Sequence, residues 1–332
     1  MIVKKYVILL RSNQRCKIRE KLKILITGGL GFIGSTFILN LLKQYPSFEI
    51  VNIDAELIGS NKKNLFSLKK NTNYKYIKSN INNRKILDSQ ISKCDVVINF
   101  AAESHVDRSI SGPKPFIDSN IMGTHNLLEC IRKHNKKFIQ ISTDEVFGSL
   151  KKGSATESWP FDPASPYAAS KAAAEMLVKS YFKTYGSDVM ITRCTNNYGP
   201  HQFEEKLIPK IILNAKNNKK IPIYGTGKNI RDWIFVDDHC DALLKVLLKG
   251  KSGESYNIST SNETSNLKVV KKILKIMKKP TSLIEFTKDR LGHDFRYSMD
   301  STKIRKQLKW MPKTNFDDGL ELTINWYLKR DR

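Results

Sequence analysis

Two short stretches in the middle of the chain combine residue types that could perform chemistry. The stretch "QISTDEVFGS" (140–149) places Asp144 and Glu145 side by side, directly after an apolar run typical of a buried strand. An ionised carboxylate is expensive to bury without a partner, so two adjacent acids there indicate a reaction. Further on, "SPYAASKA" places Tyr167 and Lys171 four residues apart, which puts them on one face of a helix.

These residues fit the removal of a proton from an alcohol, followed by an elimination. We expect the Lys171 ammonium and the charge of a nicotinamide to lower the pKa of the Tyr167 phenol from its reference of about 10, so that it can act as a base. Once the alcohol carbon is oxidised to a ketone, a carboxylate can remove the proton on the neighbouring carbon. The second carboxyl, kept protonated by its neighbour's charge, can protonate a departing hydroxyl. Thr143 completes this centre.

A glycine-rich turn earlier in the chain provides a place for a dinucleotide. In "KILITGGLGFIGSTFILNLLKQ", an apolar strand (23–27) leads through Gly28, Gly31 and Gly34 into an amphipathic helix. Glycines let the backbone approach a pyrophosphate at the helix N-terminus. The next strand ends at Asp54, whose carboxylate would accept hydrogen bonds from ribose hydroxyls and repel a 2′-phosphate, which favours NAD over NADP.

Strands and helices continue to alternate along the first half of the chain. The segments "YKYIKSN", "DVVINFAAES", "KFIQIST" and "DVMITRC" are typical of strands separated by helices. This alternation predicts an α/β fold of the Rossmann type, with a doubly wound parallel sheet and ligands at the carboxyl ends of its strands. We expect an N-terminal extension (1–22), an NAD-binding domain that carries the catalytic residues (23–195), and a smaller C-terminal α/β substrate-binding domain (196–332), some segments of which return to the first.

Composition argues against a nucleic-acid-binding protein, a disulfide-bonded protein and a membrane-spanning protein. The 57 Lys and Arg against 32 Asp and Glu give a net charge of +25, but the lysines are dispersed as doublets, so we interpret them as a basic surface and expect no nucleic-acid partner. The five cysteines form no C-x-x-C pair, which favours reduced thiols, a cytoplasmic protein and no metal site. The apolar runs are too short to span a membrane. The lysine-rich segment "NLKVVKKILKIMKK" is interpreted as an amphipathic helix of the C-terminal domain rather than a membrane-surface helix.

The longer motifs resemble those of the dTDP-glucose 4,6-dehydratases, a family of extended short-chain dehydrogenases/reductases. The resemblance runs from about Lys23 to Tyr327 and is carried by "TGGLGFIGS", "AAESHVDRSI", "STDEVFG", "SPYAASKA", "NNYGPHQFEEKLIP", "IYGTGKNIRDWIFVDDHC", "GHDFRY" and "INWY". It implies a reaction of deoxysugar nucleotide biosynthesis that converts dTDP-glucose to dTDP-4-keto-6-deoxyglucose. Tyr167 would take the C4 hydroxyl proton while hydride goes to NAD, Glu145 would take the C5 proton, Asp144 would protonate the leaving C6 hydroxyl, and the hydride would return to C6.

The resemblance also implies the residues that hold the ligands, and a homodimer formed through the Tyr167 helix. The cofactor contacts would be Gly28, Gly31, Phe32, Ile33, Gly34, Asp54, Asn80, Ile81, Ala101, Ala102, Ser104, Asn120, Tyr167, Lys171 and Asn197. The substrate contacts would be His105, Thr143, Asn196, Lys206, Leu207, Pro222, Ile223, Tyr224, Arg231, Asn262, Asp289, Arg290 and His293.

Three departures from the family pattern and three alternative activities accompany this prediction. Asn80 stands where the family usually has Asp, "AELIGS" follows Asp54 where the family usually has Leu-Thr-Tyr-Ala-Gly, and Leu291 stands where it usually has Pro. Thymidine and uridine differ by one methyl group, worth only about 1 kcal/mol of burial, so a UDP-glucose 4,6-dehydratase is the nearest alternative. A nucleotide-sugar 4-epimerase and a UDP-glucuronate decarboxylase also oxidise C4, but neither needs an acid for a C6 hydroxyl.

Overall fold

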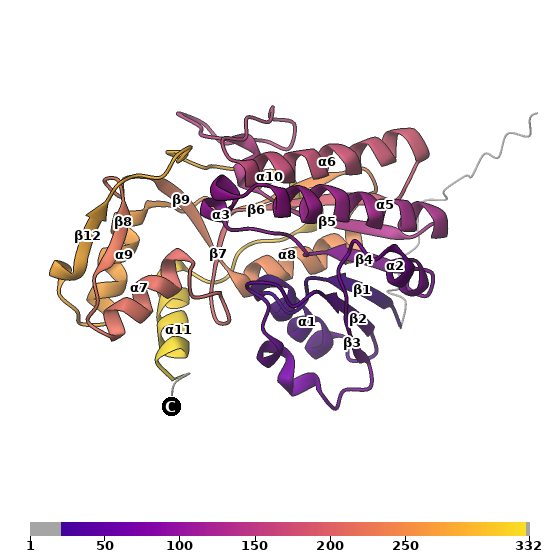
Figure 1. Cartoon of the computed structure of the whole chain (residues 1–332), viewed down its shortest axis with the longest axis horizontal. Helices are drawn as coiled ribbons and strands as arrows, with labels where there is room; N and C mark the ends of the chain where they lie inside the picture. Colours follow the sequence, from indigo (N-terminus) through magenta and orange to yellow (C-terminus); the bar gives the residue numbers. More distant parts are fainter. Residues whose placement is uncertain (1–20, 330–332) are drawn as a thin grey trace, which may run out of the picture.

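The computed structural model describes residues 21–329, so nearly all of the predicted extension 1–22 lies outside the described residues. Its larger part is built on one sheet of seven parallel strands (Figure 1). In spatial order these strands are β10 (Ser255–Ile258), β6 (Val189–Cys194), β5 (Lys137–Thr143), β4 (Val96–Asn99), β1 (Lys23–Thr27), β2 (Glu49–Asp54) and β3 (Tyr74–Lys78). Every neighbouring pair is parallel, which confirms the predicted fold class.

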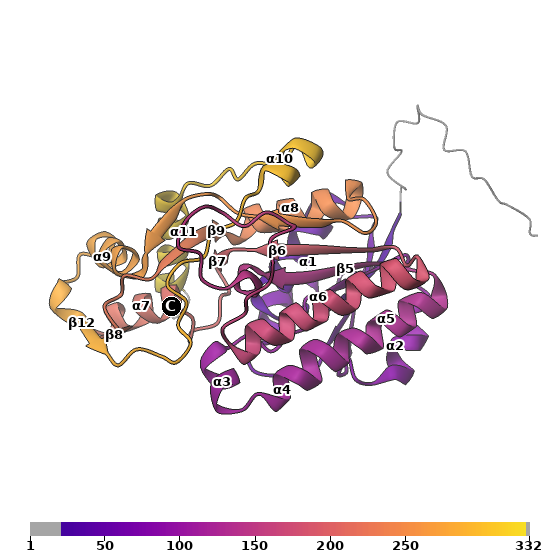
Figure 2. The same ribbon diagram turned by 90° about the horizontal axis from the view of Figure 1, so that it is seen from above.

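Helices cover both faces of this sheet because its strands are apolar on both sides. One core joins the sheet to α1 (Phe32–Gln44), α8 (Val236–Lys249) and α10 (Thr302–Leu308). The other joins it to α2 (Arg84–Ile91), α5 (Gly123–His134) and α6 (Pro166–Tyr185). Figure 2 shows α5 and α6 side by side on one face of the sheet and α8 with α10 on the other. As its amphipathic pattern predicts, α1 buries one apolar face: Phe37, Ile38, Leu41 and Leu42.

The smaller part of the molecule is built from later segments. It contains a three-stranded sheet, β11 (Glu263–Ser265), β9 (Ile230–Phe235) and β7 (Asn196–Tyr198), and the parallel pair β12 (Ile284–Thr287) and β8 (Ile221–Tyr224). A separate core packs these strands against α7 (Leu207–Lys216), α9 (Asn266–Ile276) and α11 (Phe316–Lys329). In the lysine-rich segment, the apolar face of α9 is fully buried, as the amphipathic pattern predicts: Val269, Val270, Ile273 and Leu274.

Short helical segments also connect these elements. Five lie in the segments that follow β2, β4 and β5 at the carboxyl edge of the large sheet: η1 (Lys62–Leu68), α3 (Val106–Ser111), α4 (Lys114–Phe116), the π-helical η2 (Ile117–Met122) and η3 (Asp144–Phe147). A sixth, η4 (Thr281–Leu283), directly precedes β12 in the smaller part. Because all strands of the large sheet are parallel, the segments that follow β1, β4, β5 and β6 emerge at the same edge. The glycine turn, the start of η3 and the β6–β7 connection therefore meet there.

Three further features of residues 21–329 bear on function. No helix in this range is long and apolar enough to cross a bilayer. No group of three or more His, Cys, Asp or Glu side chains in this range is arranged to hold a metal ion. The cysteines in this range are free and buried: Cys94, Cys130, Cys194 and Cys240.

Candidate active site

A cavity of about 340 Å³ opens at the carboxyl edge of the large sheet, within the size range of small-molecule sites. The five predicted catalytic residues all line it: Thr143, Asp144, Glu145, Tyr167 and Lys171. Its wall also contains every predicted cofactor residue except Asn120, and four predicted substrate residues, His105, Thr143, Asn196 and Lys206. The structure therefore brings together residues that are separated by well over a hundred positions in the sequence.

The glycine turn is packed so tightly that larger residues are excluded. Gly28 has φ +70°, and a Cβ there would lie 2.6 Å from the backbone nitrogen of Ala101. A Cβ on Gly34 would lie 2.6 Å from the carbonyl oxygen of Gly28. Helix α1 then begins after Gly31 without a side-chain cap, so its first N–H groups are free to meet an anion.

Asp54 holds the neighbouring loop while keeping some capacity to accept hydrogen bonds. Its Oδ2 accepts from the backbone N–H of Leu30 at 2.9 Å, and its Oδ1 accepts from Glu56 N and Ser60 Oγ, each at 2.8 Å. A carboxylate offers about four acceptor positions, so one remains on Oδ2 for a ribose hydroxyl.

Two predicted cofactor residues occupy less direct positions. Asn120 is buried behind the cavity wall, where its amide bonds to both backbone groups of Glu103 and donates to Ser170 Oγ at 2.8 Å. These bonds make Asn120 a support for the Glu103 segment. Asn80 lies at the exposed rim, and its Oδ1 accepts from Asn82 N at 2.8 Å.

The environment of Tyr167 differs from the prediction. Burial raises the pKa of the Tyr167 phenol well above its usual value, and the charge of Glu145 raises it further. Lys171 donates instead to the carbonyl oxygen of Ile141 at 2.6 Å, and burial lowers the pKa of its ammonium to about 8. In the protein alone the pKa of Tyr167 is therefore raised rather than lowered, because burial dominates. The lowering expected when Lys171 and a nicotinamide charge act together stays a prediction.

The two acids are held in different surroundings although they are neighbours in sequence. Asp144 is 5% exposed, and burial together with the charge of Glu145 raises its pKa to about 7. Burial also raises the pKa of Glu145, but the nearby Arg290 and Arg231 oppose this rise. Burial thus raises the pKa of both acids and Arg231 opposes the rise at both, but Glu145 also has Arg290 and Lys206 beside it, which gives it the more cationic surroundings.

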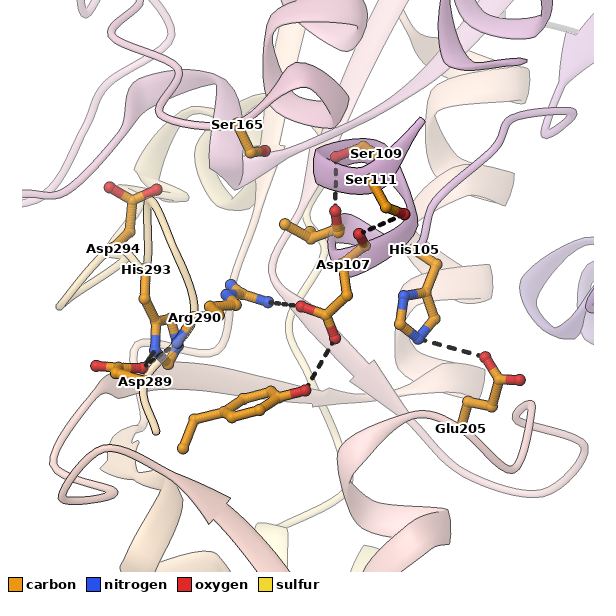
Figure 3. Close-up of polar contacts among 12 residues, drawn as sticks. His105, Asp107, Ser109, Ser111, Ser165, Glu205, Asp289, Arg290, His293 and Asp294 are labelled. Carbon is orange, nitrogen blue, oxygen red and sulfur yellow. Dashed lines mark hydrogen bonds and ion pairs between the residues drawn. The ribbon is translucent and has the colours of Figure 1, made fainter. Parts of the chain in front are cut away.

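A polar cluster at the mouth of the cavity joins the two parts of the molecule (Figure 3). Asp107, on α3, accepts a hydrogen bond from Tyr224 Oη at 3.1 Å and lies 4.0 Å from Arg290 Nη1. His293 pairs with Asp289 at 2.6 Å. His105 lies 3.4 Å from Glu205.

The other predicted substrate residues lie outside the cavity wall. Arg231 is buried, with its guanidinium 4.1 Å from the centre of the Tyr297 ring and 2.9 Å from the carbonyl oxygen of Asp294. Ile223 is 2% exposed, so its side chain belongs to the core, whereas Pro222 and Tyr224 on the same strand are more exposed. Leu207 packs against that core, and Asn262 lines a separate surface hollow beside α9. Lys206, within the cavity wall, donates to Ser104 O at 2.9 Å.

Three predicted substrate residues carry buried polar atoms with no hydrogen-bond partner among residues 21–329. These atoms are His105 Nδ1, Asn196 Oδ1 and Arg290 Nε. His105 and Asn196 line the cavity, and buried polar groups are normally paired, so their unpaired atoms point to a polar ligand there.

Sequence patterns did not identify several residues that support the site. His239, on α8, lies with its Nδ1 2.8 Å from Asn197 Oδ1, while Asn197 Nδ2 donates to Thr195 O at 2.9 Å. Tyr297 Oη lies 3.4 Å from Glu145 Oε2. Asp107 and His239 fall within the quoted motifs "AAESHVDRSI" and "FVDDHC", which is the only signal that could have found them.

Comparison with known proteins agrees with this geometry. The family model described as GDP-mannose 4,6 dehydratase matches residues 25–323. The chain belongs to this family. It is 45% identical to the low-salt glycan biosynthesis protein Agl12 of Haloferax volcanii, over 93% of this chain and 99% of that protein. It is 43% identical to a dTDP-glucose 4,6-dehydratase of Xanthomonas campestris, over 92% of each chain.

A solved structure extends the similarity to three dimensions. The crystal structure of DesIV, a dTDP-glucose 4,6-dehydratase from Streptomyces venezuelae with NAD and TYD bound, superposes with a TM-score of 0.92. That protein is 40% identical to this one, and the match covers 93% of this chain and 98% of the other. The family prediction from the motifs is thereby confirmed.

Proposed function

We propose that this protein is an NAD-dependent dTDP-glucose 4,6-dehydratase, which converts dTDP-glucose to dTDP-4-keto-6-deoxyglucose. The observation that carries the proposal is the meeting of Tyr167, Asp144 and Glu145 in one cavity, where burial raises the pKa of Asp144 to about 7 and Arg290 and Lys206 oppose the rise at Glu145. An epimerase or a decarboxylase has no use for a protonated acid at a leaving hydroxyl. The curated dehydratases at 38–43% identity support the same activity.

The residues of the cavity fit NAD. The Gly28 and Gly34 cradle leaves room for a pyrophosphate against the backbone, and the uncapped start of α1 offers N–H donors. Asp54 retains an acceptor position for a ribose hydroxyl. When bound, NAD would take a hydride from the sugar's C4 and return it to C6, so that it is regenerated in each turnover.

The protein's own groups would move the protons. Tyr167 takes the proton of the C4 hydroxyl, and Thr143 is placed to hold that hydroxyl. Glu145 takes the proton from C5 once C4 is a ketone. Asp144 gives its proton to the C6 hydroxyl, which leaves as water. The high pKa of Tyr167 in the protein alone is then offset when a cationic nicotinamide ring lies beside the phenol.

The substrate end would hold the nucleotide diphosphate. Arg290 can form planar paired hydrogen bonds to phosphate oxygens, and its unpaired Nε supplies one donor. Asn196 and His105 supply further buried polar atoms. The same groups would hold dTDP or UDP, and the relatives named as dTDP-glucose 4,6-dehydratases favour dTDP.

We further propose a cytoplasmic homodimer. The free, buried thiols suit a reducing compartment. Helices α5 and α6 lie next to each other on one face of the large sheet. Met122 on η2 and Met176 on α6 are 48% and 57% exposed, which supports a contact there with a second copy of the chain. Light scattering coupled to size-exclusion chromatography should give twice the monomer mass for the wild type. Met176→Glu should give the mass of a single monomer.

The activity test uses the purified protein without added NAD. Incubation with dTDP-glucose should give a 4-keto-6-deoxy product that absorbs in alkali, with faster turnover than UDP-glucose at equal concentration. Formation of only dTDP-galactose would indicate an epimerase instead. Faster turnover of UDP-glucose than of dTDP-glucose would show that the enzyme is a UDP-glucose 4,6-dehydratase.

A further inference from the structure

The hydroxyl of Thr195, between β6 and β7, contacts the acid Asp144 at the start of η3. Thr195 follows β6, is 3% exposed, and no ligand contact is predicted for it. Its Oγ1 lies 2.8 Å from the backbone carbonyl oxygen of Asp232 and 3.3 Å from Asp144 Oδ2. These two contacts share a single hydroxyl proton.

The position of that proton follows from what each neighbour can accept or donate. A backbone carbonyl can only accept, and it makes the shorter contact, so the Thr195 proton lies toward Asp232. Thr195 Oγ1 then presents a lone pair to Asp144 Oδ2. Two oxygen acceptors would repel each other there, whereas a proton on Oδ2 turns the contact into a hydrogen bond from Asp144 to Thr195.

The other oxygen of Asp144 is occupied from the opposite side. Thr143 Oγ1 accepts from the backbone N–H of Glu145 at 3.3 Å and donates to Asp144 Oδ1 at 3.1 Å. Oδ1 is thus the accepting oxygen of the carboxyl group, which leaves Oδ2 as the oxygen that carries the proton.

We propose that Thr195 is a positioning residue that holds the proton of Asp144 on Oδ2, so that the acid is neutral and carries the proton that the elimination needs. The inference rests on the proposed dehydratase function. When the C6 hydroxyl leaves, the O–H bond of Asp144 breaks, a new O–H bond completes a water molecule, and Asp144 remains as a carboxylate.

Several charged or titratable groups also face Asp144. Burial and the adjacent Glu145 favour its neutral form, and Arg231 favours the ionised form. The groups are Glu145 on η3, Tyr167 on α6, Cys194 on β6, and Arg231 with Asp232 on β9. All of them remain in a Thr195 variant, so a change in its pH profile reports the hydroxyl itself.

The test is the pH dependence of kcat with dTDP-glucose for wild type, Thr195→Val and Thr195→Ser. Removing an acceptor from the neutral acid lowers its pKa, so the basic limb of the Thr195→Val profile should move to lower pH by about half to one unit. Thr195→Ser keeps the hydroxyl and should keep the wild-type limb. Circular dichroism checks folding, and Thr195→Ala serves as the second variant if the valine variant fails to fold.

The opposite outcomes overturn the inference. A basic limb that stays in place, or moves to higher pH, would mean that Thr195 does not accept the proton or donates its own to an ionised carboxylate. A wild-type protein that forms no 4-keto-6-deoxy product would overturn the proposed function and this role together. Wild-type dehydration with an unshifted Thr195→Val limb would overturn the role of Thr195 alone.

Discussion

The two ends of the cavity are built differently. At the glycine turn the backbone segments are in contact, and Asp54 and Asn120 have most of their hydrogen bonds made within the protein. At the other end, His105 and Arg290 keep buried polar atoms unpaired within the described chain. The comparison indicates a preorganised cofactor end, which can keep NAD through many turnovers, and a substrate end that is completed by each incoming nucleotide sugar.

The carboxylates that we propose as catalytic, Asp144 and Glu145, lie between these ends, so their loss should leave both binding functions intact. Glu145→Gln should lower kcat by about 10²–10⁴-fold, because a positioned base is lost, while the NAD content stays at the wild-type level. Steady-state kinetics and the absorbance of an acid extract measure the two quantities. Glu285→Gln, an exposed change on β12, is the matched control. A loss of NAD in Glu145→Gln would contradict the separation of the two ends.

The next largest effect tests the preorganised end. Gly34→Ala places a Cβ 2.6 Å from Gly28 O, and overpacking of about 1–3 kcal/mol should reduce NAD affinity about 10–100-fold. Isothermal titration with NAD after removal of bound cofactor measures this change. Gly112→Ala has no atom closer than 3.9 Å and should bind like wild type. Equal affinities for all three proteins would show that the cradle does not contact the cofactor.

Arg290→Gln should weaken the substrate end and alter Glu145, while leaving the cofactor end intact. Loss of a charged donor should raise KM for dTDP-glucose about 10-fold, with unchanged NAD content. The charge of Arg290 favours the ionised form of Glu145. Its removal therefore raises the Glu145 pKa, and the acid limb of the kcat profile should move to higher pH. Arg132→Gln on α5 is the control, and an acid limb that moves to lower pH would refute the electrostatic role.

The smallest expected change concerns Asn80 at the rim of the cofactor end. Asn80→Asp restores the residue usual in the family, and a carboxylate accepts a hydrogen bond from an adenine amino group more strongly than an amide does. Because Asn80 is exposed, solvent screens this gain, and NAD should be retained only about 2–5-fold longer. The rate of NAD dissociation after dilution measures this retention. Faster dissociation from Asn80→Asp than from the wild type would show that Asn80 does not contact the adenine.

The sequence predicts those parts of the site whose geometry is local. Gly28 to Gly34 lie between one strand and one helix, and Tyr167 with Lys171 share a helical face, so spacing alone places them. Thr195 contacts Asp144 across 51 residues, and Tyr224 contacts Asp107 across 117. Such contacts depend on how the chain packs in three dimensions, and no local pattern encodes them. The raised pKa of Tyr167 was missed for the same reason, since burial by distant segments determines it.

The central claim is that one sugar is oxidised at C4, loses water and is reduced at C6 within a single cavity. Incubation of the protein with dTDP-glucose carrying deuterium at C4, followed by NMR of the product, tests it directly. The account predicts a 4-keto-6-deoxy product with the deuterium in its C6 methyl group. Deuterium retained at C4 of a galactose product, or lost from the sugar altogether, would contradict it.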